Sequence, residues 1–300
     1  MKVIIDTDPG TDDALALMMA LNAPELDIQG ITTVGGNATL AHTTRNALRL
    51  LEHLGRPDIP VYRGSARPLR GKFRYAYHFH GPGGLTVKLP RPKALPRTLG
   101  APEYIVRQAH SLRGELVLIA LGPLTNIARA IIKEPRVKEW IGEIVVMGGA
   151  VEVPGNVTPH AEFNIYGDPG AAGIVFSSGV SVTLVGLDVC DRVYIGREDG
   201  AWFSVRSGID RLAARILENW FASRDREARY SLCDPLTIVA ALRPDLLAFR
   251  QSTVAVETDD EERRGKTTAA YQGGNVRVAS AVRVDETKEL IKSLLAGQIL

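Results

Sequence analysis

The sequence is poor in the residues that build disulfide frameworks and membrane spans. Only two of its 300 residues are cysteines, Cys190 and Cys233, which are too few for a disulfide framework and typical of a reduced compartment. No apolar run reaches the roughly 20 residues that a membrane-spanning helix requires. The apolar residues 3–5 are followed at once by Asp6, whereas a signal peptide needs a longer uncharged region. We therefore expect a cytoplasmic protein without membrane association.

An excess of one charge is also lacking. The 36 basic and 34 acidic residues are mixed along the chain and leave a net charge of +2, so we expect no nucleic-acid partner. The densest basic segment, residues 263–266, is short enough to be a solvated turn. With 45% hydrophobic and 23% charged residues the composition is that of an ordinary globular protein. Because neither an internal repeat nor a low-complexity linker is visible, we expect one domain over residues 1–300.

The order of apolar runs predicts the fold class. Short apolar runs alternate with helix-length segments up to about residue 245, a pattern that favours an open, mainly parallel (mixed) α/β sheet with helices on both faces. Expected strands cover residues 3–6, 28–34, 116–121, 144–147 and 182–187. Expected helices cover residues 12–21, 40–54, 102–111, 124–133, 169–177, 209–221 and 235–241. The C-terminal part predicts an added strand pair at residues 253–257 and 276–284, followed by a final helix.

Two segments interrupt this alternation. Residues 70–96 are rich in glycine, proline, histidine and aromatic side chains, and residues 220–231 are rich in aromatic side chains and arginine. Long irregular segments inside a compact domain often cover a binding site. We therefore expect both segments to lie over the functional site.

Four carboxylates stand within eight residues near the N-terminus, at Asp6, Asp8, Asp12 and Asp13. They follow a buried strand and precede residues 14–21, which are apolar on every side and predict a buried helix. Ligands of open α/β sheets bind outside the carboxyl ends of the strands, which is where these residues lie. Like charges so close together must bind protons or share a cation. Without nearby Cys or many His, oxygen ligands favour Ca²⁺ or Mg²⁺ over zinc.

The alternative interpretation of this segment is a solvated acidic turn that caps a helix. A Pro-Gly pair between the carboxylates and an apolar helix after them do not suit such a turn. Further polar residues follow later strands, at Asp234 and in the segment 156–164, and each taken singly is an ordinary turn or capping residue. Their shared position after strands makes them candidates for the same site.

Five motifs, in the same order along the chain, resemble the inosine-uridine-preferring nucleoside hydrolase family. The first is the segment Asp6-Thr7-Asp8-Pro9-Gly10-Thr11-Asp12-Asp13, which is the most specific. The others are Thr32-Thr33-Val34-Gly35-Gly36-Asn37, Gly122-Pro123-Leu124-Thr125-Asn126, Met147-Gly148-Gly149 and Ala161-Glu162-Phe163-Asn164. The resemblance spans most of the chain. It implies an α/β fold and the hydrolysis of ribonucleosides, of purine or pyrimidine bases or both, to free base and ribose.

The resemblance also implies roles for individual residues. Asp8, Asp13, Asp234 and the main-chain carbonyl of Leu121 match Ca²⁺ ligands, and Asp8 also matches the acceptor of a proton from the attacking water. Asp6 matches a supporting carboxylate. Residues that would hold the sugar hydroxyls are Asp12, Asn37, Asn156, Glu162 and Asn164. Residues that would pack near the sugar or close over it are Met147, Phe163 and His80. Members of the family are usually homodimers or homotetramers, which is what we expect here.

One position departs from the family pattern. Many members have a histidine immediately before the residue that matches Asp234, and that histidine protonates the leaving base. Cys233 occupies the position here, as in a subset of the family. A thiol is a weak hydrogen-bond donor with an ordinary pKa of about 8.5, and it is a poor substitute for imidazole as an acid. Cys233 could equally be a small side chain that lines the pocket.

Recognition of the leaving base is therefore open. Trp220, Phe221 or Tyr230 could stack on it, although ordinary packing explains these aromatic residues equally well. Side chains that could donate hydrogen bonds to the base are Arg224, Arg226 and Arg229. His78 and His80 have a zinc-like spacing, but no other His or Cys stands near them.

Two other functions compete with nucleoside hydrolysis. A phosphohydrolase of the haloacid dehalogenase type also begins with a strand and an Asp-x-Asp pair, which Asp6 and Asp8 supply. That family requires Thr or Val at the position of Gly10, and it leaves Asp12 and Asp13 unexplained. A non-catalytic ribose- or nucleoside-binding protein could use the same contacts, but it would not need so many anions around one cation.

Overall fold

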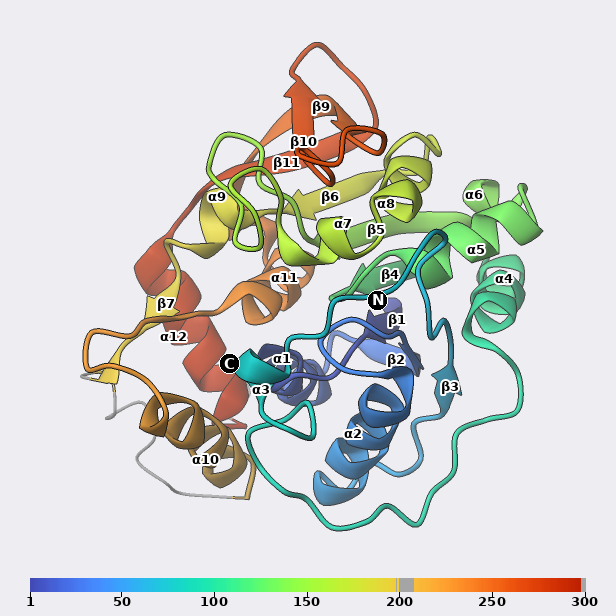
Figure 1. Ribbon diagram of the computed structural model, residues 1–300. Helices are drawn as coiled ribbons and strands as arrows, with labels where there is room; N and C mark the ends of the chain where they lie inside the picture. The colour runs from blue at the N-terminus through green and yellow to red at the C-terminus, as the bar shows by residue number, and fades with distance from the viewer. Residues whose placement is uncertain (198, 200–207, 298–300) are drawn as a thin grey trace.

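The computed structural model describes residues 1–197, 199 and 208–297, and its main feature is a nine-stranded sheet with the order β10-β9-β11-β6-β5-β4-β1-β2-β3 (Figure 1). In this sheet order, each strand from β11 across to β3 is parallel to its neighbour. Strand β9, by contrast, is antiparallel to both β10 and β11. The predicted mixed, mainly parallel α/β sheet is thus confirmed. Its strands are β1 (Lys2–Thr7), β2 (Asp27–Thr33), β3 (Val61–Arg63), β4 (Leu116–Ala120), β5 (Ile141–Met147), β6 (Val182–Val185), β9 (Leu247–Val256), β10 (Thr267–Ala270) and β11 (Val276–Val282).

Helices cover both faces of this sheet. Apolar side chains of α1, α2, α10, α11 and α12 form one hydrophobic cluster, and those of α4, α5 and α8 form another. The longer helices are α1 (Thr11–Asn22), α2 (Leu40–His53), α4 (Ala101–Leu112), α5 (Thr125–Lys133), α8 (Pro169–Phe176), α10 (Gly208–Ala222), α11 (Cys233–Leu242) and α12 (Val284–Leu295). The short ones are α3 (Tyr77–His80), α6 (Val137–Trp140), α7 (Phe163–Gly167), α9 (Leu187–Cys190) and η2 (Pro244–Leu246). Among the described residues, no helix is both long and apolar enough to cross a membrane.

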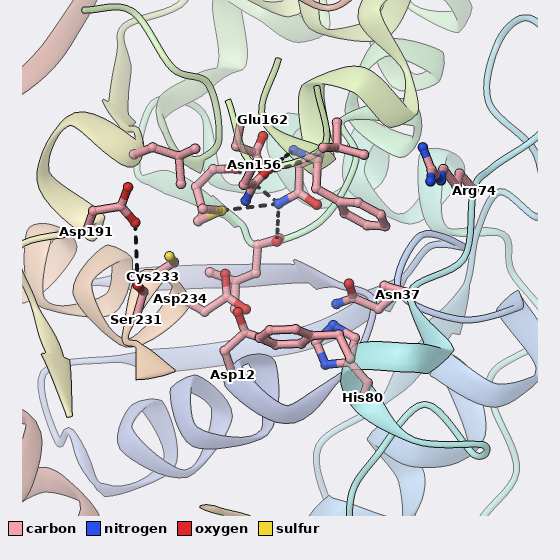
Figure 2. Close-up of a pocket in the computed structure, with 18 of the residues that line it drawn as sticks. Asp12, Asn37, Arg74, His80, Asn156, Glu162, Asp191, Ser231, Cys233 and Asp234 are labelled. Atoms are coloured by element: carbon pink, nitrogen blue, oxygen red, sulfur yellow. Dashed lines mark hydrogen bonds between the residues drawn. The ribbon is translucent and has the colours of Figure 1, made fainter. Parts of the chain in front are cut away.

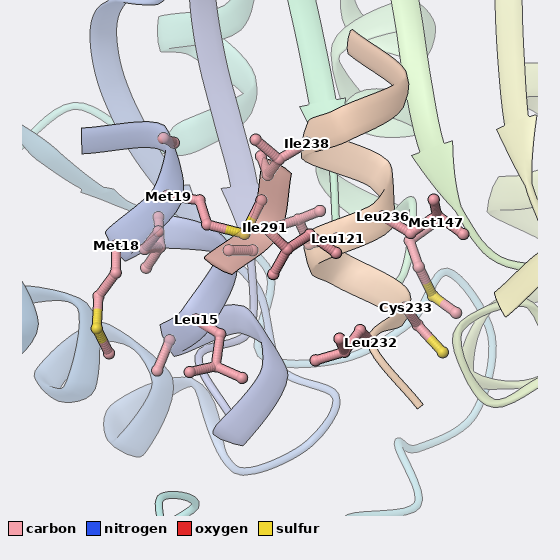
Figure 3. Close-up of a cluster of buried hydrophobic side chains, with 14 of the residues drawn as sticks. Leu15, Met18, Met19, Leu121, Met147, Leu232, Cys233, Leu236, Ile238 and Ile291 are labelled. Atoms are coloured by element: carbon pink, nitrogen blue, oxygen red, sulfur yellow. The ribbon is translucent and has the colours of Figure 1, made fainter. Parts of the chain in front are cut away.

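Helix α1 is buried on nearly every side, as its unbroken apolar sequence predicts. The side chains of residues 14–20 are at most 1% exposed. Leu15 and Met19 belong to the cluster that also contains Leu236 of α11 and Ile291 of α12 (Figure 3). Burial of this much apolar surface contributes roughly 25 cal/mol per Å² to stability. Because this core fixes α1 against α11, it also fixes the relative positions of the two helix N-termini.

The carboxyl ends of the central strands bring polar residues together. In the parallel register, Asp6 of β1 lies between Thr32 of β2 and Ala120 of β4. Ala120 in turn pairs with Val146 of β5, so the chain leaves β4 and β5 at the same edge. The segments that follow these strands therefore converge at one edge of the sheet, which is where ligands bind in open α/β folds.

Several element boundaries differ from those predicted. Strand β6 ends at Val185 rather than at residue 187, because Gly186 becomes the N-cap of α9 and Leu187 opens that helix. The C-terminal part contains three strands where the sequence predicted a pair. Strand β9 begins already at Leu247, and β10 is a four-residue edge strand. A separate two-stranded ribbon, β7 (Tyr194–Ile195) with β8 (Tyr230–Ser231), was also not predicted, because two-residue strands carry no periodic signal.

Replacement of Leu15 by Ala tests the contribution of the core around α1. Leu15 is fully buried, so Leu15→Ala should lower the free energy of unfolding by about 2–5 kcal/mol. Leu95, which is 83% exposed, supplies the control, and Leu95→Ala should change that free energy by less than about 0.5 kcal/mol. Urea denaturation followed by circular dichroism measures both, and equal effects of the two substitutions would contradict the assigned core.

Candidate active site

A cavity of about 370 Å³ opens at the carboxyl edge of the sheet (Figure 2). Small-molecule sites in proteins typically have volumes of ~300–1,000 Å³. The structure brings most of the predicted site residues together around this cavity. Those that line it are Asp12, Asn37, His80, Leu121, Met147, Asn156, Glu162, Phe163, Asn164, Cys233 and Asp234. The long segment 70–96 also contributes to the wall, through Arg74 to Ala76 and His78 to His80, in agreement with its predicted position over the site.

Carboxylates from two helices meet at one wall of the cavity. One oxygen from each of Asp12, Asp13 and Asp234 lies within 4.8 Å of the others. Asp12 and Asp13 belong to the first turn of α1, and Asp234 belongs to the first turn of α11. The positive ends of two helix dipoles therefore favour negative charge at this point. Asp8, a ligand in the family pattern, is outside this trio, but its charge still acts on Asp234.

Asp8 is fully buried next to the trio. Its Oδ2 accepts a hydrogen bond of 2.5 Å from the main-chain N–H of Asn37, and its Oδ1 has no partner among the described residues. A Cβ atom at Gly36 or at Gly122 would overlap the Asp8 carboxylate. The two glycines of the sequence motifs thus leave the space that this side chain occupies.

Asp6 and Asp13 are held by dense hydrogen-bond networks. Asp6 Oδ1 accepts from Thr32 Oγ1 at 2.5 Å and from Asn126 Nδ2 at 2.7 Å. Asp13 accepts from the hydroxyl of Thr7 and from Nδ2 of Asn37, the latter at 3.0 Å. Main-chain N–H groups at positions 8 and 10 also donate to Asp13. These donors fix both carboxylates before any ligand binds.

Burial raises the pKa of the carboxyl groups in this cluster. The pKa of Asp12 rises to about 7, and that of Asp234 rises well above its ordinary value, in both cases because of burial first and repulsion from neighbouring carboxylates second. The same two causes raise the pKa of Asp8. Asp8 Oδ1 and Asp12 Oδ1 are buried without a hydrogen-bond partner in the described part of the chain. A divalent cation would satisfy these oxygens and remove the repulsion, and an all-oxygen donor set suits Ca²⁺ or Mg²⁺.

The wall opposite the carboxylates carries amides and one further carboxylate. Glu162 caps α7 and accepts from the N–H groups of Asn164 at 2.8 Å and of Ile165 at 3.1 Å. Asn164 Nδ2 donates to the carbonyl oxygen of Leu121 at 2.8 Å, and Asn156 Oδ1 accepts from the main chain at position 163. These contacts hold the three side chains at the wall of the cavity, where Figure 2 labels Asn156 and Glu162. The cavity is therefore lined by preorganised polar groups on two sides.

His80 is neutral and lies against the start of α1. The N–H of Thr11 donates to His80 Nδ1 at 3.0 Å, so the remaining ring proton is on Nε2. Burial, together with the charges of His78 and Arg224, lowers the pKa of His80 to about 3. His80 can thus donate a hydrogen bond from Nε2 without carrying a charge.

Comparison with known proteins identifies this arrangement. Residues 3–289 match the family described as inosine-uridine preferring nucleoside hydrolase. The chain belongs to this family. Uridine nucleosidase 1 of Arabidopsis thaliana is 41% identical over 86% of the chain and 78% of its own length. The pyrimidine-specific ribonucleoside hydrolase RihA of Citrobacter koseri is 38% identical over 100% of the chain and 98% of its own length.

Solved structures agree with this assignment. The plant nucleoside hydrolase PpNRh1 superposes with a TM-score of 0.93 at 36% identity, and 98% of each chain is covered. A purine-preferring ribonucleoside hydrolase from Gardnerella vaginalis superposes with a TM-score of 0.93 at 30% identity, and 99% of each chain is covered. The protein is accordingly an enzyme that hydrolyses the N-glycosidic bond of ribonucleosides. The phosphohydrolase and the non-catalytic binding protein are thereby set aside.

Cys233 of this nucleoside hydrolase lines the cavity, and its free thiol is beside that of Cys190. Interaction with the Cys190 thiol, together with burial, raises the pKa of Cys233 well above its ordinary value. A group with so high a pKa is a weak acid and a poor proton donor to a departing base. The chemistry of Cys233 therefore gives no support to the histidine-dependent step of other family members.

The aromatic residues considered for base stacking do not line the cavity. Trp220, Phe221 and Tyr230 are at most 7% exposed. Trp220 packs edge-on against Tyr230, with ring centroids 4.7 Å apart, and against Phe79, at 5.4 Å. Phe79 itself lines the cavity, so these rings support it from behind. Ordinary packing, the alternative for these aromatic residues, accounts for their positions.

The three arginines considered for the base have different surroundings. Arg224 donates to the carbonyl oxygen of Phe79 at 3.0 Å and lies over the Trp220 ring at 3.9 Å, so it ties α10 to the segment around α3. Arg226 is exposed and does not line the cavity. Arg229 does line it. Of the three, only Arg229 has the position of a direct ligand.

Four polar lining residues were not singled out from the sequence. Arg74 and Tyr75 belong to the long segment 70–96, and Ser231 belongs to the segment 220–231, so their regions but not their roles could be predicted. No feature of the sequence indicated that Asp191 would line the site. It follows the four-residue helix α9, which apolar periodicity cannot reveal.

Substitution of Gly122 tests the position of Asp8. The new methyl group of Gly122→Ala would displace the Asp8 carboxylate, and a displacement near 1 Å costs about 100-fold in rate when a catalytic group is involved. Gly173→Ala is the matched control, because its methyl group would meet no atom within 4 Å. Ribose release and thermal melting should show an inactive but folded Gly122→Ala and an active Gly173→Ala. Normal activity of Gly122→Ala would place the functional carboxylate elsewhere.

The raised pKa of Asp12 predicts a pH-dependent stability. In a chelator, folded Asp12 keeps its proton up to about pH 7, whereas the unfolded chain loses it near 3.8, so folding becomes less favourable as pH rises between these values. In Asp12→Asn the side chain at position 12 does not titrate. The free energy of unfolding of this variant minus that of the wild type should therefore increase by ~1–3 kcal/mol from pH 4 to pH 7. A divalent cation should reduce this difference. Denaturant titrations at several pH values measure it, and a difference independent of pH would contradict the assigned cause.

Proposed function

We propose that this nucleoside hydrolase depends on Ca²⁺ and holds it with Asp8, Asp13, Asp234 and the carbonyl oxygen of Leu121. The observation that carries the proposal is the set of carboxylates at the cavity, whose charges are balanced by no ion pair in the described chain. The unpartnered Asp8 Oδ1 and the position of Leu121 on the cavity wall support this ligand set. Asp12 belongs to the trio, so it lies close enough to Asp13 and Asp234 to contact the same cation or the sugar.

The remaining polar side chains suit a ribose. We propose that Asp12, Asn37, Asn156, Glu162 and Asn164 bind the sugar hydroxyls, while Met147 and Phe163 pack against the ring. Glu162 and Asn164 are held by main-chain contacts, so hydroxyl binding would need little reorganisation. His80 would close the site from α3 with its Nε2–H, and Asp6 would support Asn126 and the strand ends around the cluster.

Negative charge around the sugar favours cleavage of the glycosidic bond. The transition state carries positive charge on the sugar ring, and carboxylates and amide oxygens in a water-poor pocket stabilise that charge. Calcium, when bound, orients the sugar diol and makes the attacking water more acidic. Asp8 has a free oxygen and a raised pKa, so it is suited to take the proton of that water. No covalent intermediate is required.

The proposed substrates are ribonucleosides that include uridine. The relatives from Arabidopsis thaliana and Citrobacter koseri carry names for uridine and pyrimidine nucleosides, whereas a structural neighbour is named for purines. Cys233 would line the base side of the pocket without serving as its acid. We further propose that residues 1–300 form one domain, that the enzyme is cytoplasmic, and that it assembles as a homodimer or homotetramer.

Ribose release with and without a chelator tests the calcium dependence. The purified enzyme should release ribose from uridine, lose this activity in EGTA, and regain it when Ca²⁺ but not buffer alone is added back. Calorimetry should detect Ca²⁺ binding that is absent in Asp13→Asn. Full activity after exhaustive chelation would remove the cation from the proposal while leaving the hydrolase assignment intact.

Substitution of Asp8 tests its role as proton acceptor. Asp8→Asn can still accept the hydrogen bond from Asn37 N–H but cannot take a proton, so kcat should fall by about 10²–10⁴-fold. Asp58→Asn is the control, because Asp58 is an exposed partner of Arg56 far from the cavity. A kcat for Asp8→Asn within a few-fold of the wild type would exclude Asp8 as the acceptor.

A further inference from the structure

The cavity has a second polar end that the sugar contacts leave unused. Asp191, Arg229 and Ser231 line this end, and Figure 2 shows Asp191 and Ser231 on the side of Cys233 away from Asn37 and His80. These three residues are called the distal polar set below. The charge of Asp191 contributes to the raised pKa of the Cys233 thiol, which agrees with the proximity of these two side chains.

The small ribbon β7–β8 positions the distal polar set. Arg229 and Ser231 are two residues apart, and residues at this spacing point to the same side of an extended chain, whereas Tyr230 between them points into the core. Ser231 pairs with Tyr194, and Asp191 stands three residues before that partner, at the end of α9. The ribbon and the residues that flank it therefore bring one acid, one base and one hydroxyl to the same part of the cavity.

Asp191 has hydrogen-bonding capacity to spare. Its carboxylate accepts one side-chain hydrogen bond in the described chain, from Ser231 Oγ at 3.4 Å. The described residues show no ion pair to it. Partial burial raises its pKa above the ordinary value. Because a carboxylate only accepts hydrogen bonds at neutral pH, Asp191 fits a ligand group that donates one, such as a ring N–H.

Arg229 supplies the complementary donors. Its guanidinium lies 4.4 Å from the centroid of the Tyr194 ring, a contact that restrains the plane of the group. The described residues offer this guanidinium no hydrogen bond or ion pair, so its N–H groups remain available to a ligand that carries a carbonyl oxygen.

We propose that the distal polar set recognises the –NH–C(=O)– edge of the nucleobase, with Asp191 accepting from the ring N–H and Arg229 donating to the adjacent carbonyl oxygen. This inference rests on the proposed function, because a ribose held at the carboxylates leaves the base the space beyond Cys233. Uracil presents this edge at N3 and C4, and 6-oxopurines present it at N1 and C6. Cytosine and adenine present an amino group beside an unprotonated ring nitrogen instead.

Methylated nucleosides test the recognition directly. The wild-type kcat/KM for N3-methyluridine should be ~10–100-fold below that for uridine, because the methyl group removes the N–H and leaves Asp191 unpaired. 5-Methyluridine, which keeps the edge and adds the same methyl group elsewhere, should be cleaved within a few-fold of uridine. The comparison of inosine with 1-methylinosine tests the same edge in 6-oxopurines. The two comparisons together show which of the two base classes uses the edge.

Variants connect the discrimination to Asp191. Asp191→Ala should lose ~10–100-fold in kcat/KM for uridine and nothing for N3-methyluridine, so the discrimination should disappear. Asp191→Asn keeps an acceptor oxygen and should retain part of the discrimination between uridine and N3-methyluridine. This variant therefore separates a loss of recognition from misfolding. Glu227→Gln is the matched control, because Glu227 is an exposed acid near Arg229 that does not line the cavity. Its kcat/KM values should equal those of the wild type.

The outcomes separate this inference from the proposed function. Failure of the wild type to release ribose from uridine and inosine would overturn the proposed function itself. Ribose release combined with equal cleavage of every cleaved nucleoside and its N-methyl derivative, or with unchanged discrimination in Asp191→Ala, would overturn only the role of the distal polar set. Loss of discrimination in Asp191→Ala with a normal melting temperature would establish it.

Discussion

Repulsion among carboxylates that are withdrawn from water is the constraint on which the rest of this structure depends. Asp8, Asp13 and Asp234 are almost completely buried, and the pKa of each is raised by burial. A protein tolerates such a group only if hydrogen bonds, helix dipoles or a cation stabilise the charged form. The Thr and Asn side chains, the two convergent helix N-termini and the glycines beside Asp8 all serve this requirement.

The apolar core and the polar site are parts of one arrangement. The carboxylates of α1 and α11 meet because Leu15, Met19 and Leu236 pack the two helices together below the cavity. The strand register places Asp6 beside Thr32, so the same sheet that buries the core also supplies hydrogen bonds to the cluster. Side chains far from the cavity thus determine distances within it, and the site is as rigid as the core beneath it.

Much of this could be predicted from the sequence, for physical reasons that also set the limit. The parallel sheet and the buried α1 follow from apolar runs, and the acidic site follows from carboxylates placed after a buried strand. Contacts across the chain could not be derived in this way. Nothing in the spacing shows that Cys190 contacts Cys233, that Thr11 sets the tautomer of His80, or that Asp191 reaches the cavity from a four-residue helix. Each depends on how loops close, which local periodicity does not encode.

The ribbon β7–β8 is a sheet of its own and shares no strand with the nine-stranded sheet. Ser231 of this ribbon, which lines the cavity, is therefore outside the strand register that supports the carboxylates. Under the two proposals, the residues for bond cleavage and those for base choice lie on different pieces of the chain. A fold arranged in this way can acquire new substrates through changes to a few peripheral residues, while the residues that cleave the bond stay unchanged.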